Sequence, residues 1–256
     1  MAAKTKTESA ALDIVALEIG EVTFHVLGVS PFIYNAMSAK VQGELLVPKG
    51  KMTSSEKANN MKHDPVAEFR RSVYSQPRGN TRLIFPSVAL KKAVMCAALD
   101  MPTSVSKTQI GRLVWAKGEN MEMFGVPDLF MTGVRMADIA RTPDVRTRAR
   151  LKTWATEVTF QFTKPMLSAQ SLGLLMQAAG LLNGLGDGRQ QKGTHSFGQF
   201  EIVNPDDPRY LEVLRTGGRE AQEAALEAAE PGDCESEALL NYFNSEVARR
   251  FDKKAA

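Results

Sequence analysis

The sequence predicts an α+β protein built on a ferredoxin-like (RRM-like) antiparallel sheet, with two core helices, a basic insertion and a C-terminal helical extension. With the insertions set aside, the hydrophobic patterns follow the order strand, helix, strands, strand, helix, strand. Hydrophobic residues make up 43% and charged residues 24% of the 256 residues, as in globular proteins. No apolar run reaches the roughly 18 residues that a membrane span needs. These observations indicate one decorated domain with its core over residues 12–203.

The N-terminal part of the chain predicts a disordered start at residues 1–11, followed by one long strand. Apolar residues alternate from Leu12 to Val29, and the phase of this alternation changes near Gly20. We therefore expect a bulge or a bend at that glycine. The dipeptide Ser30-Pro31 then predicts a short helix that continues through Ala39, because proline favours the first helical turn.

A basic insertion is predicted over residues 40–81. Residues 40–64 are rich in Lys, Ser and Asn and poor in large apolar groups, which indicates an exposed, mobile segment. Residues 65–75 predict a short amphipathic helix. After the insertion, a strand end at Leu83–Phe85 leads into a helix that reaches residue 100. Cys96 lies on the apolar face of this helix, so we expect a buried thiol rather than a nucleophile.

The second half of the core predicts two strands within residues 110–131 and a third at residues 157–163, where apolar and polar residues alternate. Ser168 is placed to cap a helix, and Phe200 and Ile202 predict a last core strand. The remaining residues, 204–256, predict an acidic helical tail with helices at about 218–229 and 235–251.

Charge is unevenly distributed, although the formal net charge is only +3. Residues 1–200 hold 25 Lys and Arg against 16 Asp and Glu, whereas residues 201–256 hold 7 against 13. Two stretches are basic: residues 40–92, with 11 positive and 4 negative side chains, and residues 134–152, with 6 and 2. Two basic clusters on one domain favour a polyanionic partner. The alternative is a solvated surface balanced by the tail, and we also consider that the tail competes with a polyanion for the basic surface.

The composition also bears on compartment and cofactors. Two cysteines, Cys96 and Cys234, cannot form a disulfide framework, and the first residues lack the apolar stretch of a signal peptide. We therefore expect a cytoplasmic protein. No His, Cys and Asp residues show metal-ligand spacing, so we expect no metal and no cofactor.

The most informative stretch is residues 180–203, in which five glycines occur between Gly184 and Gly198. Glycines allow positive φ and close approach of a ligand, and exposed backbone amides beside Arg189 and Lys192 suit phosphate oxygens. A P-loop is excluded because a helix precedes this stretch and a strand follows it, the reverse of that motif.

This stretch resembles the C-terminal glycine-rich loop of the RAMP superfamily, the ferredoxin-like subunits that form the backbone of CRISPR effector complexes. A second similarity is the run Phe85–Ala93 (FPSVALKKA), which resembles the family pattern I-P-x-S-S-L-K-G-x-L-R at the start of the first long helix. A third is the Arg-, Thr- and Asp-rich run Asp138–Arg150 at the family's usual insertion. The chain departs from the family at Lys92, where glycine is usual, and its loop holds less arginine. The layout also resembles that of phage proteins.

The resemblance implies single-stranded RNA binding through the sheet face, the helix start and the glycine-rich loop, with several subunits aligned along the strand. From it and from the charge pattern, we expect a non-catalytic protein that coats single-stranded RNA or DNA as a homo-oligomer or filament through phosphate contacts. In an extended segment, Arg146, Arg148 and Arg150 would share one side. The nucleic-acid-binding candidates are Lys91, Lys92, Arg141, Arg146, Arg148, Arg150, Arg189, Lys192, His195, Arg70 and Arg71.

Several alternatives remain open at this stage. An RNA endonuclease of the same fold would use His195 as a general acid or base. A phage structural or assembly protein would associate with itself without nucleic acid. The arginines of residues 138–150 would, in a third alternative, pair with Asp138, Asp144 and the acidic tail. Five aromatic residues are candidates for stacking on bases wherever they are exposed: Phe69, Tyr74, Trp115, Trp154 and Phe197.

Overall fold

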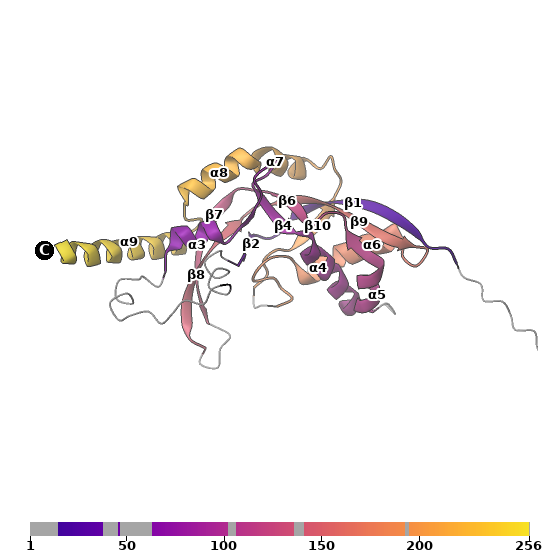
Figure 1. The fold of residues 1–256 in the computed structure, drawn as a ribbon, viewed down its shortest axis with the longest axis horizontal. Helices are drawn as coiled ribbons and strands as arrows, with labels where there is room; N and C mark the ends of the chain where they lie inside the picture. Colours follow the sequence, from indigo (N-terminus) through magenta and orange to yellow (C-terminus); the bar gives the residue numbers. More distant parts are fainter. Residues whose placement is uncertain are drawn as a thin grey trace, which may run out of the picture.

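The computed structural model describes residues 15–37, 46, 63–101, 106–135, 141–192 and 195–255, with side chains up to residue 250. Within these residues the chain forms two antiparallel sheets and seven α-helices (Figure 1). The predicted α+β class is confirmed. The larger sheet is curled like half of a barrel, and helices lie on both of its sides.

The larger sheet has the strand order β10-β1-β9-β6-β4-β3, and β5 pairs with β9 beside β6. Neighbouring strands of this sheet pair antiparallel within the described residues. Its strands are β1 (Glu18–Gly28), β3 (Tyr74–Ser75), β4 (Leu83–Pro86), β5 (Val114–Ala116), β6 (Asn120–Phe124), β9 (Ala155–Lys164) and β10 (Phe200–Val203). The predicted strands at 83–85, 157–163 and 200–202 are confirmed.

Strand β1 is confirmed as one long strand, but the bulge predicted at Gly20 is wrong. β1 pairs with β9 one residue to one residue from Glu18 to Leu27, through Gly20. The change of phase has another cause: Ile19 of β1 is 68% exposed, and Val15 and Leu17, which precede the strand, are 64% and 66% exposed. Apolar residues therefore occur on both faces of this segment without any break in its register.

The main core lies between the larger sheet and the helices α4 (Ser87–Asp100) and α6 (Ala169–Ala178). Phe24 and Phe160 of the sheet meet Leu90 and Leu172 of the helices in this core. Ser168 caps α6 as predicted, since its hydroxyl accepts from the Ser171 amide at 3.0 Å. Cys96 of α4 is buried, as predicted.

Helix α5 (Lys107–Leu113) occupies a segment that we assigned to a strand, so that part of the prediction is wrong. Ser106 and Gln109 form a capping box at its start, and this pattern was present in the sequence. The two strands predicted in this region are present as β5 and β6, and both are shorter than predicted.

The smaller sheet has the strand order β2-β8-β7 and consists of β2 (Phe32–Ile33), β7 (Pro127–Arg135) and β8 (Pro143–Leu151). The helix predicted over residues 30–39 is wrong as far as residue 37, and residues 38 and 39 lie outside the described residues. Phe32 and Ile33 pair with β8, and the Tyr34 amide donates to Ala149 at 2.9 Å. The pairing of Phe32 and Ile33 with β8 and the burial of the rings of Phe32 and Tyr34 outweigh the local preference for a helix.

Helix α3 (Pro65–Arg71) confirms the helix predicted near residue 65, and its N-cap is Asp64, whose carboxylate accepts from the Ala67 amide at 3.1 Å. The helix ends at Arg71 and not at residue 75 as predicted, and the last two residues of the predicted helix form β3. The disorder predicted at residues 1–11 concerns residues outside those described. The same holds for the mobility predicted at 40–64, apart from Leu46, His63 and Asp64.

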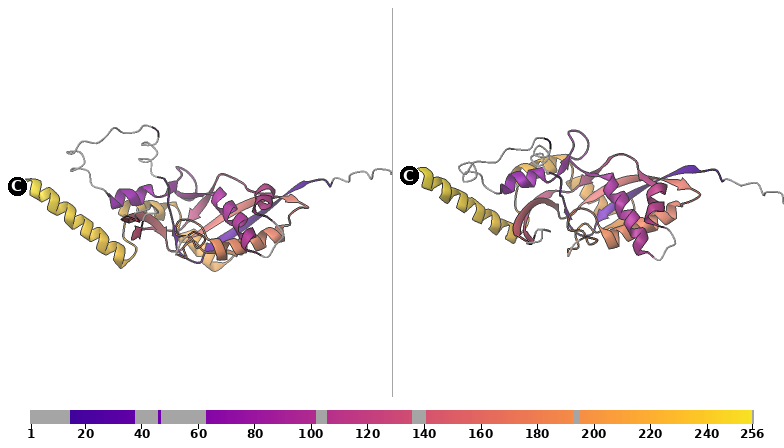
Figure 2. Two further views of the ribbon diagram at one scale, coloured as in Figure 1. Left: turned by 90° about the horizontal axis from the view of Figure 1, so that it is seen from below. Right: turned by 60° about the horizontal axis from the view of Figure 1, so that its bottom comes forward.

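The C-terminal residues form α7 (Pro208–Thr216), α8 (Arg219–Ala228) and α9 (Cys234–Ala255). The two predicted tail helices are confirmed, whereas α7 was not predicted, although Asp207 and Pro208 are a typical helix start. Helix α9 begins against β7 and then projects away from the body (Figure 2). None of the described helices is both long and apolar enough to cross a membrane.

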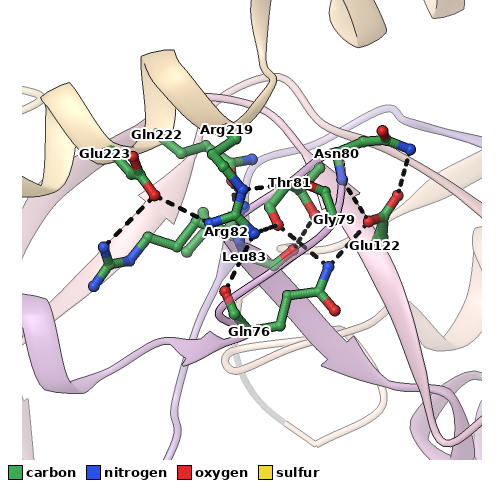
Figure 3. A network of polar contacts seen from close by, with 10 residues as sticks. All are labelled: Gln76, Gly79, Asn80, Thr81, Arg82, Leu83, Glu122, Arg219, Gln222 and Glu223. Carbon is green, nitrogen blue, oxygen red and sulfur yellow. Dashed lines mark hydrogen bonds and ion pairs between the residues drawn. The ribbon is translucent and has the colours of Figure 1, made fainter.

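A polar network holds α8 against the larger sheet (Figure 3). The side chain of Gln222 is fully buried, and its oxygen accepts from the amides of Arg82 and Leu83 at 2.8 and 2.9 Å. Its amide nitrogen donates to Met123 and Gly217 at 2.7 and 2.8 Å. A buried amide with its hydrogen bonds made fixes one docking geometry for the helix.

Replacing Gln222 should therefore destabilise the whole domain. We expect Gln222→Ala to lower the free energy of unfolding in urea by about 3 kcal/mol, because several buried backbone groups lose their partner at roughly 1–3 kcal/mol each. The matched control is Glu227→Ala, an exposed side chain on the same helix, which should change the free energy by less than about 0.5 kcal/mol. Equal stability of the two variants would contradict this role for Gln222.

Candidate nucleic-acid interface

The glycine-rich loop, residues 184–198, is anchored at its base. It follows the π-helical turn Ala179–Asn183 at the end of α6. The Leu185 amide donates to Gly198 at 2.9 Å, and the Asp187 amide donates to Ile33 at 2.9 Å. Gly198 has a φ of +71°, and a Cβ there would lie 1.8 Å from the carbonyl oxygen of Leu185, so only glycine fits. The base of the loop is thus part of the packed body.

The tip of the loop faces solvent. Gln190, Gln191, Lys192, His195 and Ser196 are exposed, whereas Leu185 at the base is buried. The loop is therefore not sealed inside the core. Residues 193 and 194 lie outside the described residues.

The β7–β8 hairpin meets this loop. The Arg148 guanidinium forms an ion pair with the Asp187 carboxylate. On the other strand, the ring of Phe130 contacts that of Phe197 edge to face, with centroids 6.1 Å apart. Burial, and to a lesser extent the charge of Arg146, lower the pKa of Arg148. Residues 39 and 67 positions apart in the sequence are thus in contact where the hairpin meets the loop.

Arg150 has an internal role in the structure. It is only 8% exposed, and its guanidinium donates to both oxygens of Asp128 at 2.9 and 3.1 Å. A third bond, of 2.8 Å, reaches Asp233 in the C-terminal tail, and the guanidinium lies 4.6 Å from the centroid of the Phe130 ring. For Arg150, the structure therefore shows the alternative in which the arginine pairs with the acidic tail.

The other arginines of the hairpin are more accessible. Arg146 pairs with Asp144 at 3.3 Å, and its side chain is 43% exposed. Arg141 is exposed at the end of the described hairpin and has a φ of +47°. Arg146, Arg148 and Arg150 alternate along β8, as predicted for an extended segment, and their exposure increases toward the hairpin end. Asp138 lies outside the described residues.

Lys91 and Lys92 lie in the second turn of α4. Lys92 is exposed and Lys91 is half-buried. The helix is connected to the loop through Asn183, whose side-chain amide donates to the Ala93 carbonyl at 2.9 Å. In the loop itself, the Arg189 guanidinium donates to the Gly186 carbonyl at 3.0 Å, which holds this cation close to the loop backbone.

The two arginines of α3 differ. Arg70 donates to the carbonyls of Leu226 and Glu227 at 2.9 and 2.7 Å, and so caps the C-terminal end of α8. Arg71 is exposed. Arg70 therefore ties α3 to the tail, and the structure does not bring it to the loop.

The aromatic candidates also separate. Phe69 and Trp154 are fully buried in the core, and Trp115 donates to the Gln161 side chain at 2.6 Å. Tyr74 is half-buried with its ring against Phe85, and Phe197 is half-buried on the loop and stacked with His195 at a centroid distance of 5.4 Å. Sequence reasoning missed Phe130 and Asp187, which join the hairpin to the loop. In the sequence, Phe130 lies between Leu129 and Met131, so no alternation of apolar and polar residues marks it as lying on the other face of the strand.

The open face of the sheet, which the family resemblance implicates, carries paired polar groups. Lys117 binds Glu21 at 2.9 Å, and Thr23 and Thr159 share a hydrogen bond of 2.9 Å. Bonds from Lys117 and then Gln161 lower the pKa of Glu21, which keeps a negative charge on this face. Phosphate oxygens are therefore better matched to the loop and hairpin.

A scan against protein-family models finds no match to this chain, and a search of curated proteins finds no relative. Among the described residues, no three His, Cys, Asp or Glu side chains are grouped to hold a metal ion. The site is therefore interpreted from its own geometry.

Arg150 gives a prediction about stability. We expect Arg150→Ala to lower the free energy of unfolding by about 3 kcal/mol, because it leaves the Asp128 carboxylate without its main partner in a largely buried site. The control is Lys152→Ala, which removes an exposed cation 3.5 Å from the same carboxylate and should cost less than about 1 kcal/mol. Urea denaturation of both variants compares them, and a stable Arg150→Ala variant would be inconsistent with the internal role.

Asp233 gives a prediction about pH. Burial by itself raises the pKa of this carboxyl, but bonds from Ser236 and Arg150 outweigh it, so its pKa in the folded protein is lowered. The carboxylate therefore contributes stability above its unfolded-state pKa of about 3.9, and this contribution is lost as the pH falls through the folded pKa.

We expect Asp233→Asn to be less stable than the wild type near pH 7 and to approach it as the pH falls below about 4. Unfolding in urea at a series of pH values measures this convergence. Asp206→Asn, at an exposed aspartate, should follow the wild-type curve. Parallel curves for Asp233→Asn and the wild type would argue against the linkage.

Proposed function

We propose that this protein binds single-stranded nucleic acid, RNA or DNA, where the glycine-rich loop meets the β7–β8 hairpin. The observation that carries this proposal is the junction itself: Asp187 of the loop pairs with Arg148 of the hairpin beneath an exposed loop tip. An anchored loop that presents backbone amides and cations suits a flexible polyphosphate chain. The protein would act without catalysis.

The arrangement of the larger sheet supports a RAMP-like, ferredoxin-like core. Its first long strand, β1, lies between β10 and β9, and β9 lies between β1 and the pair β5 and β6. Helix α4 directly follows β4, which comes after β1, β2, α3 and β3 in the chain, and helix α6 follows β9; the two helices contact each other. The part β10-β1-β9-β6 of this order is consistent with a split β-α-β unit repeated once, and we propose it as a ferredoxin-like core to which β4 and β3 are added beyond β6.

The cations proposed to contact phosphates are those with exposed or half-buried side chains. They are Lys91, Lys92, Arg141, Arg146, Arg189 and Lys192, with His195 at the loop tip. Arg148 supports the surface through Asp187, whereas Arg70 and Arg150 serve the internal structure. Exposed Arg71 stays a proposed contact at the margin. Phosphate contacts of this kind give affinity with little sequence readout.

We further propose that several copies align along one strand in the cytoplasm, the host cytoplasm if a phage encodes the protein. Both cysteines are free thiols, which suits a reducing compartment. A coating protein of this kind repeats the same phosphate contacts in each subunit, so binding should be steeply dependent on salt.

A salt titration tests the function. The logarithm of the affinity for a labelled single strand should fall against the logarithm of salt concentration with a slope of about −0.7 for each phosphate contact. The double variants Lys91→Ala/Lys92→Ala and Arg141→Ala/Lys192→Ala should each make this slope less steep by about one to two units.

The matched control removes the same charge elsewhere: Lys107→Ala/Arg112→Ala, both exposed on α5, should leave the slope unchanged. A salt-independent affinity, or equal changes of slope in all three double variants, would rule out the proposed surface. Electrophoresis of the bound RNA separates the endonuclease alternative, which requires cleaved strands. Sedimentation without nucleic acid separates the assembly-protein alternative, which requires self-association of the free protein.

A further inference from the structure

We propose that the stacked side chains of His195 and Phe197 form a platform on which one nucleobase of the bound strand stacks. This inference rests on the proposed function and deepens it, because it assigns a contact to the base in addition to the phosphates. The phosphate surface alone would accept any flexible polyanion, whereas a platform favours a chain that carries flat aromatic rings.

The platform is built on a defined backbone. The two rings lie 5.4 Å apart between centroids with an angle of 23° between their planes. Gly188 lies beneath them with a φ of +62°, and a Cβ at this position would approach Phe197 Cδ2 to 2.9 Å and His195 Cβ to 3.5 Å. The absence of a side chain at Gly188 therefore allows the pair to lie against the loop.

The hairpin supports the platform from the other side. The Phe130 ring meets Phe197 edge to face, with an angle of 73° between the planes, and Arg150 in turn lies over Phe130. Arg150 is held by Asp128 and Asp233, so the series of contacts runs from the rigid body to the loop tip. Phe197 is thereby fixed as the inner ring, and His195 is the outer one.

The outer ring is accessible. His195 is exposed, as is its neighbour Ser196, whereas Phe197 is half-buried. Aromatic rings exposed next to cations are the usual elements of single-strand binding surfaces, because every base has a π face and every nucleotide has a phosphate. Here Arg189 lies directly opposite Phe197 in the loop, paired with it as a β-bridge. A nucleotide stacked on His195 would therefore have its phosphate within reach of loop cations.

The test separates bases from phosphates. Fluorescence anisotropy at one salt concentration measures the affinity of the full chain for labelled oligothymidylate, for oligouridylate and for an abasic strand of the same length. The wild type should bind both strands with bases about tenfold more tightly than the abasic strand, the order expected for one base–aromatic stack. His195→Ala should remove this tenfold preference, because the loss of its own phosphate contact weakens binding to all three strands alike, whereas the loss of the ring weakens binding only to the two strands with bases.

Two further variants guard against a folding defect. His195→Phe keeps a flat ring and should retain the preference for bases, and Ser196→Ala, beside it in the loop, should match the wild type. The platform is refuted if His195→Ala keeps the wild-type preference, or if it weakens all three strands equally, since the ring would then act through charge alone. Salt-insensitive wild-type binding to all three strands would instead overturn the proposed function, so the two failures are distinguishable.

Discussion

The buried guanidinium of Arg150 is the interaction on which the arrangement of this molecule depends most. It joins Asp128 of β7 to Asp233 at the start of α9, and it lies against the ring of Phe130. A guanidinium largely removed from water is stable only when its donors are satisfied, and here two carboxylates satisfy it. Because Phe130 then contacts Phe197, the same cation also contributes to the position of the glycine-rich loop.

The acidic tail has a structural role as a consequence. From the sequence, the negative charge of the tail indicates either that the tail balances the charge of the basic part of the chain or that it competes with a polyanion for the basic surface. In the structure, Asp233 binds Arg150, the carbonyls at the end of α8 bind Arg70, and Gln222 satisfies backbone groups of the larger sheet. The tail from α7 to the start of α9 thus packs as part of the body, and the basic residues separate into those that hold it and those that face solvent.

The parts of the fold that sequence reasoning predicted correctly share one property, a periodicity that burial enforces over many residues. β9 alternates because one face lies on the core, and α4 and α6 have apolar stripes because each covers the sheet. The errors fall where local and long-range preferences conflict. Ser30-Pro31 predicts a helix, but Phe32 and Ile33 gain more from pairing with β8 than one short helix would offer.

The candidate site shows the same division. From the sequence alone came the α+β class, the residue types and the loop, with glycines that permit tight turns and the cations near residues 91, 146 and 189. Only the tertiary structure decided which cations form internal ion pairs. Arg148 and Arg150 pair with Asp187 and Asp233, which lie far away in the sequence. Alternation along β8 specifies a common side for these arginines, but only packing determines whether that side meets carboxylates or water.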